Sequence, residues 1–426
     1  MREYRRSGWK RLCITAVVSA LLLVPMLVTG TAGGDANQSS SPARSLTRLG
    51  LQFNGSPTCS SEKCHGAEKA TERPDLWGNE YTLWHGRKDP HHTAYRTLLS
   101  PKSKEIAGKL KVTAANKSDR CTECHSTYAV GPSGQDLEGK EYSVAEGVSC
   151  DSCHGPSQKW FDPHAQVGWV KQERATLSHA DLLRTTGLYD TQPLLTRAQR
   201  CVECHLTTDA DVVAAGHPQP VFEMYHFSAI YPERHWRDAG GTFAAQVWAN
   251  GQAAELSAVM SRLAREAAAK PTATADELKR SLDRAMAHYS VFATLFTSFA
   301  VSSADYPALA AAAKKLGGGD ASMIGEAAKA AEEAADKIAP ALMKFNPDKA
   351  TAGKILSAIA TADFAGLFGV EGQEQQAYAI EAMAQASGAE AVAAAVVIIL
   401  PKKPGEAVAP ADFARGLAAV RSKLAK

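Results

Sequence analysis

Four short units of the chain place a histidine directly after the second of two cysteines. Three of them have the spacing C-x-x-C-H, at residues 121–125, 150–154 and 201–205, and the fourth, at residues 59–65, has four residues between its cysteines. C-x-x-C-H is the attachment signature of c-type haem, in which both sulfurs bond covalently to the macrocycle and the histidine binds the iron as proximal ligand. The sequence therefore predicts four covalently attached haem c groups. Their cysteines are Cys59, Cys64, Cys121, Cys124, Cys150, Cys153, Cys201 and Cys204, and their proximal histidines are His65, His125, His154 and His205.

Two other kinds of site also use paired cysteines. Such pairs can supply thiolates to tetrahedral zinc, and in a secreted chain they can form a framework of disulfides. Neither kind of site requires a histidine directly after the second cysteine, and all four units have one. We favour the haem interpretation because it accounts for this histidine.

Low-spin electron-transfer haems need a second axial ligand on each iron. Nine histidines remain after the four proximal ones, and those that we predict as distal iron ligands are His91, with His92 as its alternative, His164 and His217. Weaker candidates are His85, His179 and His235, whereas His226 and His288 are expected to be structural, His288 on a face of the helical region. Met224 is the only methionine in residues 35–239, so bis-histidine coordination is the default.

The overall charge excludes one class of partner. The 47 Lys and Arg residues nearly balance the 45 Asp and Glu residues, which leaves a formal net charge of +2. A protein that wraps a polyphosphate is usually strongly basic, so we expect no nucleic-acid partner. No serine triad, P-loop or dinucleotide fingerprint points to another class of chemistry.

The first 34 residues have the order of a secretory signal peptide. A basic segment is followed by an apolar run at residues 12–28 and then by small residues. We expect cleavage and a periplasmic or otherwise extracytoplasmic protein; the alternative is a membrane anchor that is retained. Thiols outside the cytoplasm become oxidised, so the eight cysteines beyond the signal are expected to be bound to something or paired.

Composition divides the rest of the chain into three parts. Residues 35–50 are small and polar and are predicted to be a flexible linker. Residues 51–239 hold all eight cysteines but few aliphatic residues, so we expect loops and short helices whose interior is filled by the haems. Residues 240–426 are alanine-rich with helical spacing, and they predict an all-α domain of five to seven helices, most simply a four-helix-type bundle. Within it, residues 274–277 form a capping box, and the apolar run at residues 396–400 is either a strand or a buried helix end.

The stretch from Cys59 to Trp236 resembles the multihaem cytochrome family typified by cytochrome c-554. The carrying features are the four haem units together with Glu80-Tyr81, Trp84, Asp89-Pro90-His91, Ala94-Tyr95, the run Gly147 to Pro156, Gly216-His217-Pro218, Phe222-Glu223 and His235-Trp236. The resemblance implies a mainly helical fold with little sheet, and four haems that stack in close pairs and pass electrons along mostly bis-histidine irons. Members of this family can keep one iron five-coordinate. The alanine-rich half lies outside the resemblance.

Three functions fit these features. The first and favoured one is an electron relay that connects extracytoplasmic redox proteins as donor and acceptor, and it needs only the four units and the distal histidines. The second is a multihaem oxidoreductase in which one five-coordinate iron acts on a small nitrogen or oxygen species. The third is a redox sensor or scaffold whose helical half binds a partner or a second copy of the chain.

Overall fold

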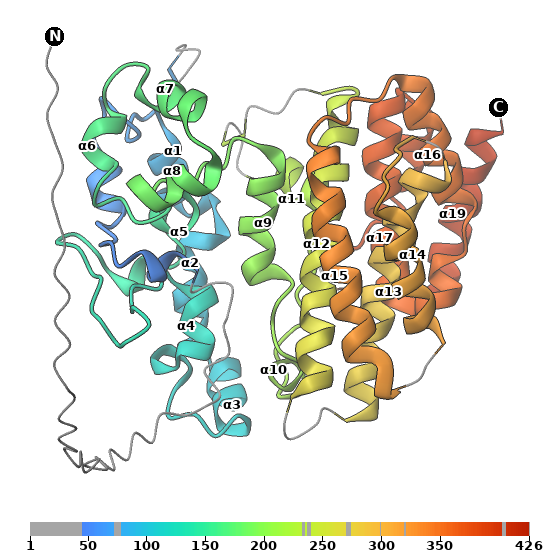
Figure 1. Ribbon diagram of the computed structural model, residues 1–426, viewed down its shortest axis with the longest axis horizontal. Coiled ribbons are helices and arrows are strands. Elements are labelled where there is room, and N and C mark those ends of the chain that lie inside the picture. Colours follow the sequence, from blue (N-terminus) through green and yellow to red (C-terminus); the bar gives the residue numbers. More distant parts are fainter. Residues whose placement is uncertain are drawn as a thin grey trace, which may run out of the picture. The chain divides into compact units, whose positions relative to one another are not determined.

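The computed structural model describes residues 45–71, 78–231, 235–236, 240–269, 274–298, 300–318, 321–402 and 406–425, and these are mainly helical (Figure 1). Among the described residues the β-contacts are two isolated bridges, Phe53 with Glu138 and Val130 with Asp136. The predicted mainly α fold is therefore confirmed. The predicted signal peptide at residues 1–34 and the first part of the predicted linker, residues 35–44, lie outside the described residues.

The cysteine-containing half is built from short helical segments joined by loops. Most are one or two turns long, and the longest is α9 with 12 residues. In chain order they are η2 Leu46–Leu49, η3 Ser56–Cys59, α1 Glu80–Leu83, η4 Trp84–Lys88, α2 Pro90–Thr97, α3 Pro101–Lys109, η5 Ala115–Lys117, α4 Asp119–His125, η6 Val144–Glu146, α5 Cys150–His154, α6 Phe161–His164, α7 Trp169–Thr176, α8 His179–Thr186, α9 Leu194–His205, α10 Ala210–Ala214 and α11 Met224–Ile230.

Three of the four cysteine units form the last turn of a helix. The helices α4, α5 and α9 each end on the histidine that follows the second cysteine. Residues three apart lie on the same face of a helix, so this last turn directs both sulfurs of a unit to one side. The wider unit differs, because η3 ends at its first cysteine, Cys59, and the chain then turns through a hydrogen bond from Cys64 N to Ser61 O at 2.9 Å.

Apolar packing in the cysteine-containing half is limited to small groups of side chains. The largest separate group consists of Leu46, Phe53, Ala129, Leu137 and Tyr189. Two further groups contain three buried residues each. Leu46, within the last part of the predicted linker, belongs to the largest of these groups and is only 1% exposed. No group is large enough to serve as an ordinary core for some 190 residues, as the aliphatic-poor sequence predicts.

The alanine-rich half folds as an all-α bundle. Its helices are α12 Phe243–Ala268, α13 Ala275–Thr297, α14 Tyr306–Gly317, α15 Ile324–Leu342, α16 Lys349–Thr361, α17 Phe364–Ser387, α18 Glu390–Val396 and α19 Pro410–Leu424, with η7 Ala321–Met323 before α15. In the described residues this makes eight α-helices where five to seven were expected, because the last apolar run ends the short α18 and α19 follows it. In the run at residues 396–400, Val396 ends α18 and the rest forms the turn after it; Val396 and Ile399 are buried, whereas Val397 and Ile398 are exposed.

Helix α12 joins the two halves of the fold. It packs against α13, α15 and α17 within the bundle, and also against α9, which carries the last cysteine unit (Figure 1). Leu195, Ala198 and Val202 of α9 belong to the same buried core as Trp248 of α12. The described residues from Ser45 onward belong to one compact unit, so the bundle directly supports one of the four cysteine units. The division of the chain near residue 240 stays a prediction.

In the part of the chain that the structure describes, none of the helices taken singly has the length and apolar character needed to cross a membrane. The pair α16 and α17 meets the same criteria of length and composition only when both helices are taken together across a bend of 116°.

The predicted capping box at the start of α13 is confirmed. Glu277 N donates to Thr274 Oγ1 at 3.3 Å, and Thr274 N donates to Glu277 Oε2 at 2.8 Å. Both N–H groups would otherwise have no partner within the helix.

We expect Thr274→Ala to lower the free energy of unfolding by about 1 kcal/mol, since the backbone N–H of Glu277 loses its acceptor. Urea unfolding followed by far-UV circular dichroism measures this loss. Thr274→Ser keeps the hydroxyl and is expected to stay close to the parent; equal destabilisation by both substitutions would contradict the capping role.

Candidate haem-binding site

Three of the four proximal histidines face a second imidazole. The ring centroids of His65 and His164 are 6.3 Å apart. Those of His205 and His91 are 6.1 Å apart, and those of His125 and His217 are 6.0 Å apart. In each case the second histidine was predicted from the sequence as a distal ligand, although the sequence did not indicate which proximal histidine it would face.

The spacing of these pairs fits two axial ligands of one metal ion. Because a bond between a metal and an imidazole nitrogen is about 2 Å long, imidazoles on opposite sides of one ion have centroids about 6 Å apart. A haem iron takes its four equatorial nitrogens from the macrocycle and needs only two axial ligands from the protein. Among the described residues no three His, Cys, Asp or Glu side chains converge as a metal-binding group. The spacing of the three pairs is compatible with a metal that takes two ligands from the protein.

Hydrogen bonds at Nδ1 orient these imidazoles. Nδ1 of His65 lies 3.0 Å from Glu80 Oε2, and Nδ1 of His91 lies 2.9 Å from Asp89 Oδ1. The corresponding acceptors are Ala94 O for His125 at 3.1 Å, Pro218 O for His217 at 2.7 Å, and Phe161 O for His164. An acceptor at Nδ1 places the ring proton there and leaves the lone pair of Nε2 available to a metal.

Burial keeps two of the proximal histidines neutral. Burial, together with the nearby imidazole of His91, lowers the pKa of His205 to about 4. Burial is likewise the main cause that lowers the pKa of His154 to about 4, and His235 and His65 contribute to this value. A neutral imidazole is the form that binds iron, so both rings are ready to act as ligands at neutral pH.

The thiols of different units lie close together. Cys59 is hydrogen-bonded to Cys150, and Cys124 to Cys204. The thiol neighbour and burial together raise the pKa of Cys150 and of Cys124 well above the usual value, so both remain protonated at neutral pH. These contacts bring the first unit beside the third, and the second beside the fourth, in the interior of this half.

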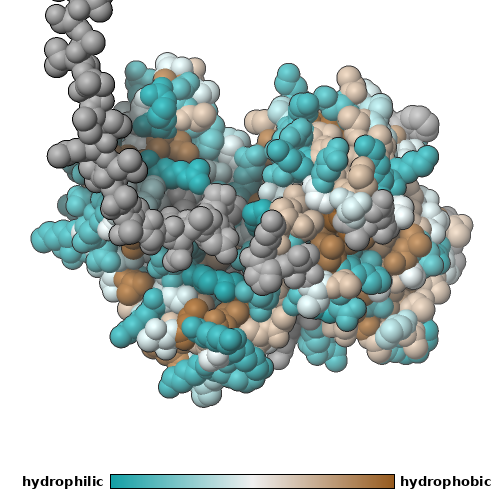
Figure 2. All heavy atoms as spheres, turned by 60° about the horizontal axis from the view of Figure 1, so that its bottom comes forward, coloured by the Kyte–Doolittle hydropathy of each residue, from teal (hydrophilic) through white to brown (hydrophobic). Residues whose placement is uncertain are grey.

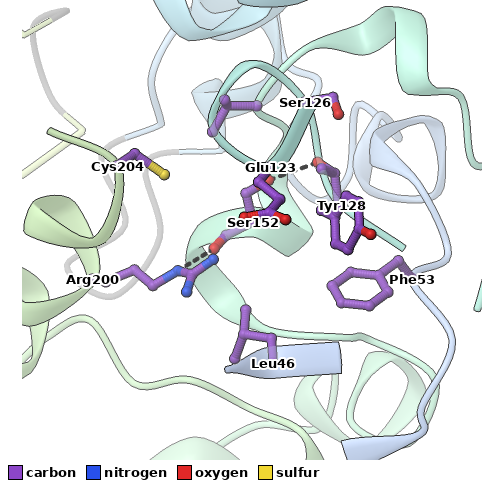
Figure 3. A pocket seen from close by; sticks show the side chains of 10 residues that line it. Leu46, Phe53, Glu123, Ser126, Tyr128, Ser152, Arg200 and Cys204 are labelled. Atoms are coloured by element: carbon purple, nitrogen blue, oxygen red, sulfur yellow. Dashed lines mark hydrogen bonds between the residues drawn. The ribbon is translucent and has the colours of Figure 1, made fainter. Parts of the chain in front are cut away.

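Arg200 connects the third and fourth units beside this interior. It extends from α9 between Cys204 and Ser152, and it lines a cavity together with Leu46, Phe53 and Glu123 (Figure 3). Its Nε donates to Ser152 O at 2.5 Å, and its guanidinium is paired with Glu203. Arg200 and Glu203 both lie on α9, so their ion pair holds the guanidinium in place, and the bond to Ser152 O connects α9 to α5.

His154 is the proximal histidine with a different environment. Among the described residues it has no imidazole at the close ring spacing of the other three pairs. Its titratable neighbours include His235, which is half-buried and has its ring centroid 5.1 Å from that of Tyr231. The sequence ranked His235 low, because a single histidine before a tryptophan carries no spacing signal; only the folded chain brings it beside His154.

The remaining histidines have packing roles in the structure. The ring of His92 is 4.4 Å from that of Trp84 and 5.1 Å from that of His85, while its neighbour His91 faces His205. His179 packs on Tyr189, and His226 Nδ1 lies 2.7 Å from Glu381 Oε2. His288 is not on the face of the bundle as expected. It is 1% exposed because its side chain points from α13 toward α12, where its Nδ1 lies 3.6 Å from Glu255 Oε2.

A comparison with known protein families identifies the first part of this site. Residues 58–155 match the family model of cytochrome c554 and c-prime. The match covers the first three cysteine units and confirms the resemblance inferred from the sequence. Cytochrome c554 domains bind c-type haem covalently and transfer electrons through it. No curated protein and no solved structure matches the chain.

Carboxylates distinguish two of the imidazole pairs from the third. Glu80 raises the pKa of His65, and Asp89 raises that of His91, although burial alone would lower both. Asp89 is 1% exposed and also accepts a hydrogen bond from Tyr231. The pair His125 and His217 instead donates to neutral oxygens. A carboxylate acceptor makes an iron ligand more basic and favours the ferric state.

We expect Asp89→Asn and Glu80→Gln each to raise the reduction potential of one haem by roughly 60 mV, a tenfold change in its redox equilibrium. A spectroelectrochemical titration of the haem-loaded protein measures the potentials. Asp181→Asn serves as control, because Asp181 bonds only to Ser178 and Arg184 on the surface of α8. Unchanged potentials in both test variants would refute the tuning role of the carboxylates.

Proposed function

We propose that the chain is an exported tetrahaem c-type cytochrome that relays electrons between redox proteins outside the cytoplasm. The observation that carries this proposal is the set of three imidazole pairs, each with the spacing of axial ligands and each including one histidine of a cysteine unit. Haem-based electron transfer follows from the family match. The number of four haems and the relay role go beyond that match and are part of the proposal. The signal-like first 34 residues support export.

The residues of each unit have separate tasks in this proposal. The two cysteines would hold a haem covalently, the following histidine would bind one side of the iron, and His164, His91 or His217 would bind the other side. The haem supplies a one-electron couple at its iron when bound. The protein orients the imidazoles through their Nδ1 acceptors, keeps His205 neutral by burial, and connects α9 to α5 through the bond from Arg200 to Ser152 O.

This arrangement suits electron transfer more than catalysis. Imidazoles on both sides of an iron leave no position for a substrate, and a rigidly held ligand set changes little between oxidation states. The adjacent thiols of Cys59 and Cys150, and of Cys124 and Cys204, support short distances between neighbouring haems. The electron donor and the electron acceptor are then both extracytoplasmic redox proteins.

A second candidate function rests on His154. If His235 does not ligate the iron opposite His154, that haem has one open axial position. Such an iron could bind and reduce or oxidise a small nitrogen or oxygen species, with Tyr231 and Asp89 near His235 as a hydrogen-bonded pair that could handle a proton. We place the electron relay first because axial ligation of iron from both sides accounts for all three imidazole pairs.

Haem content and spin state test the relay directly. We expect the pyridine haemochrome assay to give four haems per chain and electron paramagnetic resonance to show low-spin ferric iron. Near-perpendicular imidazoles give a low-spin signal of large anisotropy, and near-parallel ones a rhombic signal. The planes meet at 78° for His205 with His91 and at 80° for His125 with His217, but at 6° for His65 with His164, so both signal types are expected. A high-spin signal that responds to cyanide would favour the enzyme; zero haem would refute both functions.

His217→Ala tests the pairing of one ligand set. It is expected to convert one of the four haems to high spin, since His125 then loses the imidazole opposite it. His179→Ala is the matched control, because His179 packs on Tyr189 away from the pairs and its loss is expected to leave the spectrum unchanged. An unaltered spectrum in His217→Ala would remove His217 from the ligand set.

A further inference from the structure

One surface of the cytochrome half concentrates positive charge. Residues 96–118 contain six basic residues and one acidic residue, Glu105, whereas the entire chain has a net charge of only +2. All six basic side chains are exposed. We call them the basic face; it comprises Arg96 at the end of α2, Lys102, Lys104 and Lys109 on α3, Lys111 after it, and Lys117 on η5.

The basic face adjoins one particular imidazole pair. A β-carbon placed on Gly216 would lie 3.1 Å from Lys102 Nζ and 3.8 Å from Lys109 Nζ, so both ammonium groups lie against the chain just before His217. On the opposite side of the pair, Thr97 Oγ1 is 3.0 Å from Nδ1 of His125. Residues 96–118 thus contact His125 through Thr97 and lie beside the residue before His217 through Lys102 and Lys109.

The same segment also exposes an apolar side chain. Leu99 is 51% exposed and lies between Thr97 and the start of α3. Figure 2, which brings the lower side of Figure 1 forward, shows hydrophilic residues with small hydrophobic areas between them over this part of the surface. An apolar spot with a charged rim is the usual anatomy of a protein–protein contact.

Acidic groups beside the basic face are already engaged. Lys102 and Lys109 share Glu105, at 3.5 Å and 2.7 Å. Arg120, just beyond the face, is paired with Asp211 at 2.7 Å and lies 3.8 Å from Asp209. Arg96, Lys104, Lys111 and Lys117 therefore add positive charge that Glu105 does not balance. Such a surface attracts an acidic partner and accelerates its approach.

We infer that the basic face docks an acidic redox protein and that electrons pass there between this partner and the haem held by His125 and His217. The inference rests on the proposed relay and identifies the surface through which it connects to one partner. In the reaction one electron leaves the reduced centre of the partner and converts ferric to ferrous iron, or the reverse; no bond is formed or broken. The acidic partner is a folded protein rather than a small anion, because the lysines that it would contact are spread over α3 and η5.

The test uses the haem-loaded full chain and two reductants. The first is the hydroquinone of a flavodoxin, a strongly acidic one-electron donor protein, and the second is the neutral semiquinone of lumiflavin, generated by flash photolysis. Lys104→Glu/Lys111→Glu/Lys117→Glu is expected to slow reduction by flavodoxin about tenfold at low ionic strength, and this difference is expected to shrink as salt is added. Reduction by lumiflavin is expected to stay unchanged, because a neutral donor does not sense the lysines.

A second triple variant separates local from overall charge. Lys329→Glu/Lys337→Glu/Lys344→Glu changes the net charge equally, but at exposed positions on or after α15 in the bundle. It is expected to reduce the flavodoxin rate much less. Equal slowing by both variants, or no slowing in the first, would overturn the docking inference while leaving the relay intact. Failure of lumiflavin to reduce the parent protein would instead refute the relay itself.

Discussion

The hydrogen bond at Nδ1 is the interaction on which the proposed ligand sets depend. An imidazole can bind iron only when Nε2 is free and points at the metal, and an acceptor at Nδ1 satisfies both conditions at once. Glu80, Asp89, Ala94, Phe161 and Pro218 provide these acceptors. Most are local in sequence to the histidine they orient, so short helices and turns can preset each ring even though this half has no large apolar core.

Long-range order in this half comes from different contacts. The bond from Arg200 Nε to Ser152 O holds α9 beside α5, and the apolar side of α9 continues into the core around α12. The bundle thus gives a rigid support to a region whose own apolar groups are small. A fixed support matters for electron transfer, because the spacing of redox centres must not change when the iron changes its charge.

Charge is distributed unevenly over the three imidazole pairs. The pairs of His65 and of His91 each have a carboxylate behind one ring, whereas the pair of His125 and His217 has neutral acceptors and lysines close by. Negative charge near an iron stabilises its ferric form, and positive charge stabilises the ferrous form. A haem held by His125 and His217 would therefore have the surroundings of an electron acceptor relative to haems at the other two pairs.

The sequence by itself determined the local chemistry and the fold class. The C-x-x-C-H units, the capping box at Thr274 and the alanine-rich periodicity depend on residues a few positions apart, and local geometry follows directly from such spacing. His91, His164 and His217 could be selected because proline or glycine next to them indicates a turn or a helix start. The family resemblance followed from the same motifs.

Only the tertiary structure decided which histidines face each other and what surrounds them. Members of each pair are separated by some ninety residues or more, and no local pattern relates His65 to His164 or His205 to His91. The approach of His235 to His154, the burial of His288 and the attachment of α9 to the bundle have the same origin. They result from side-chain packing between distant segments, and such packing is fixed by the shape of the whole folded chain.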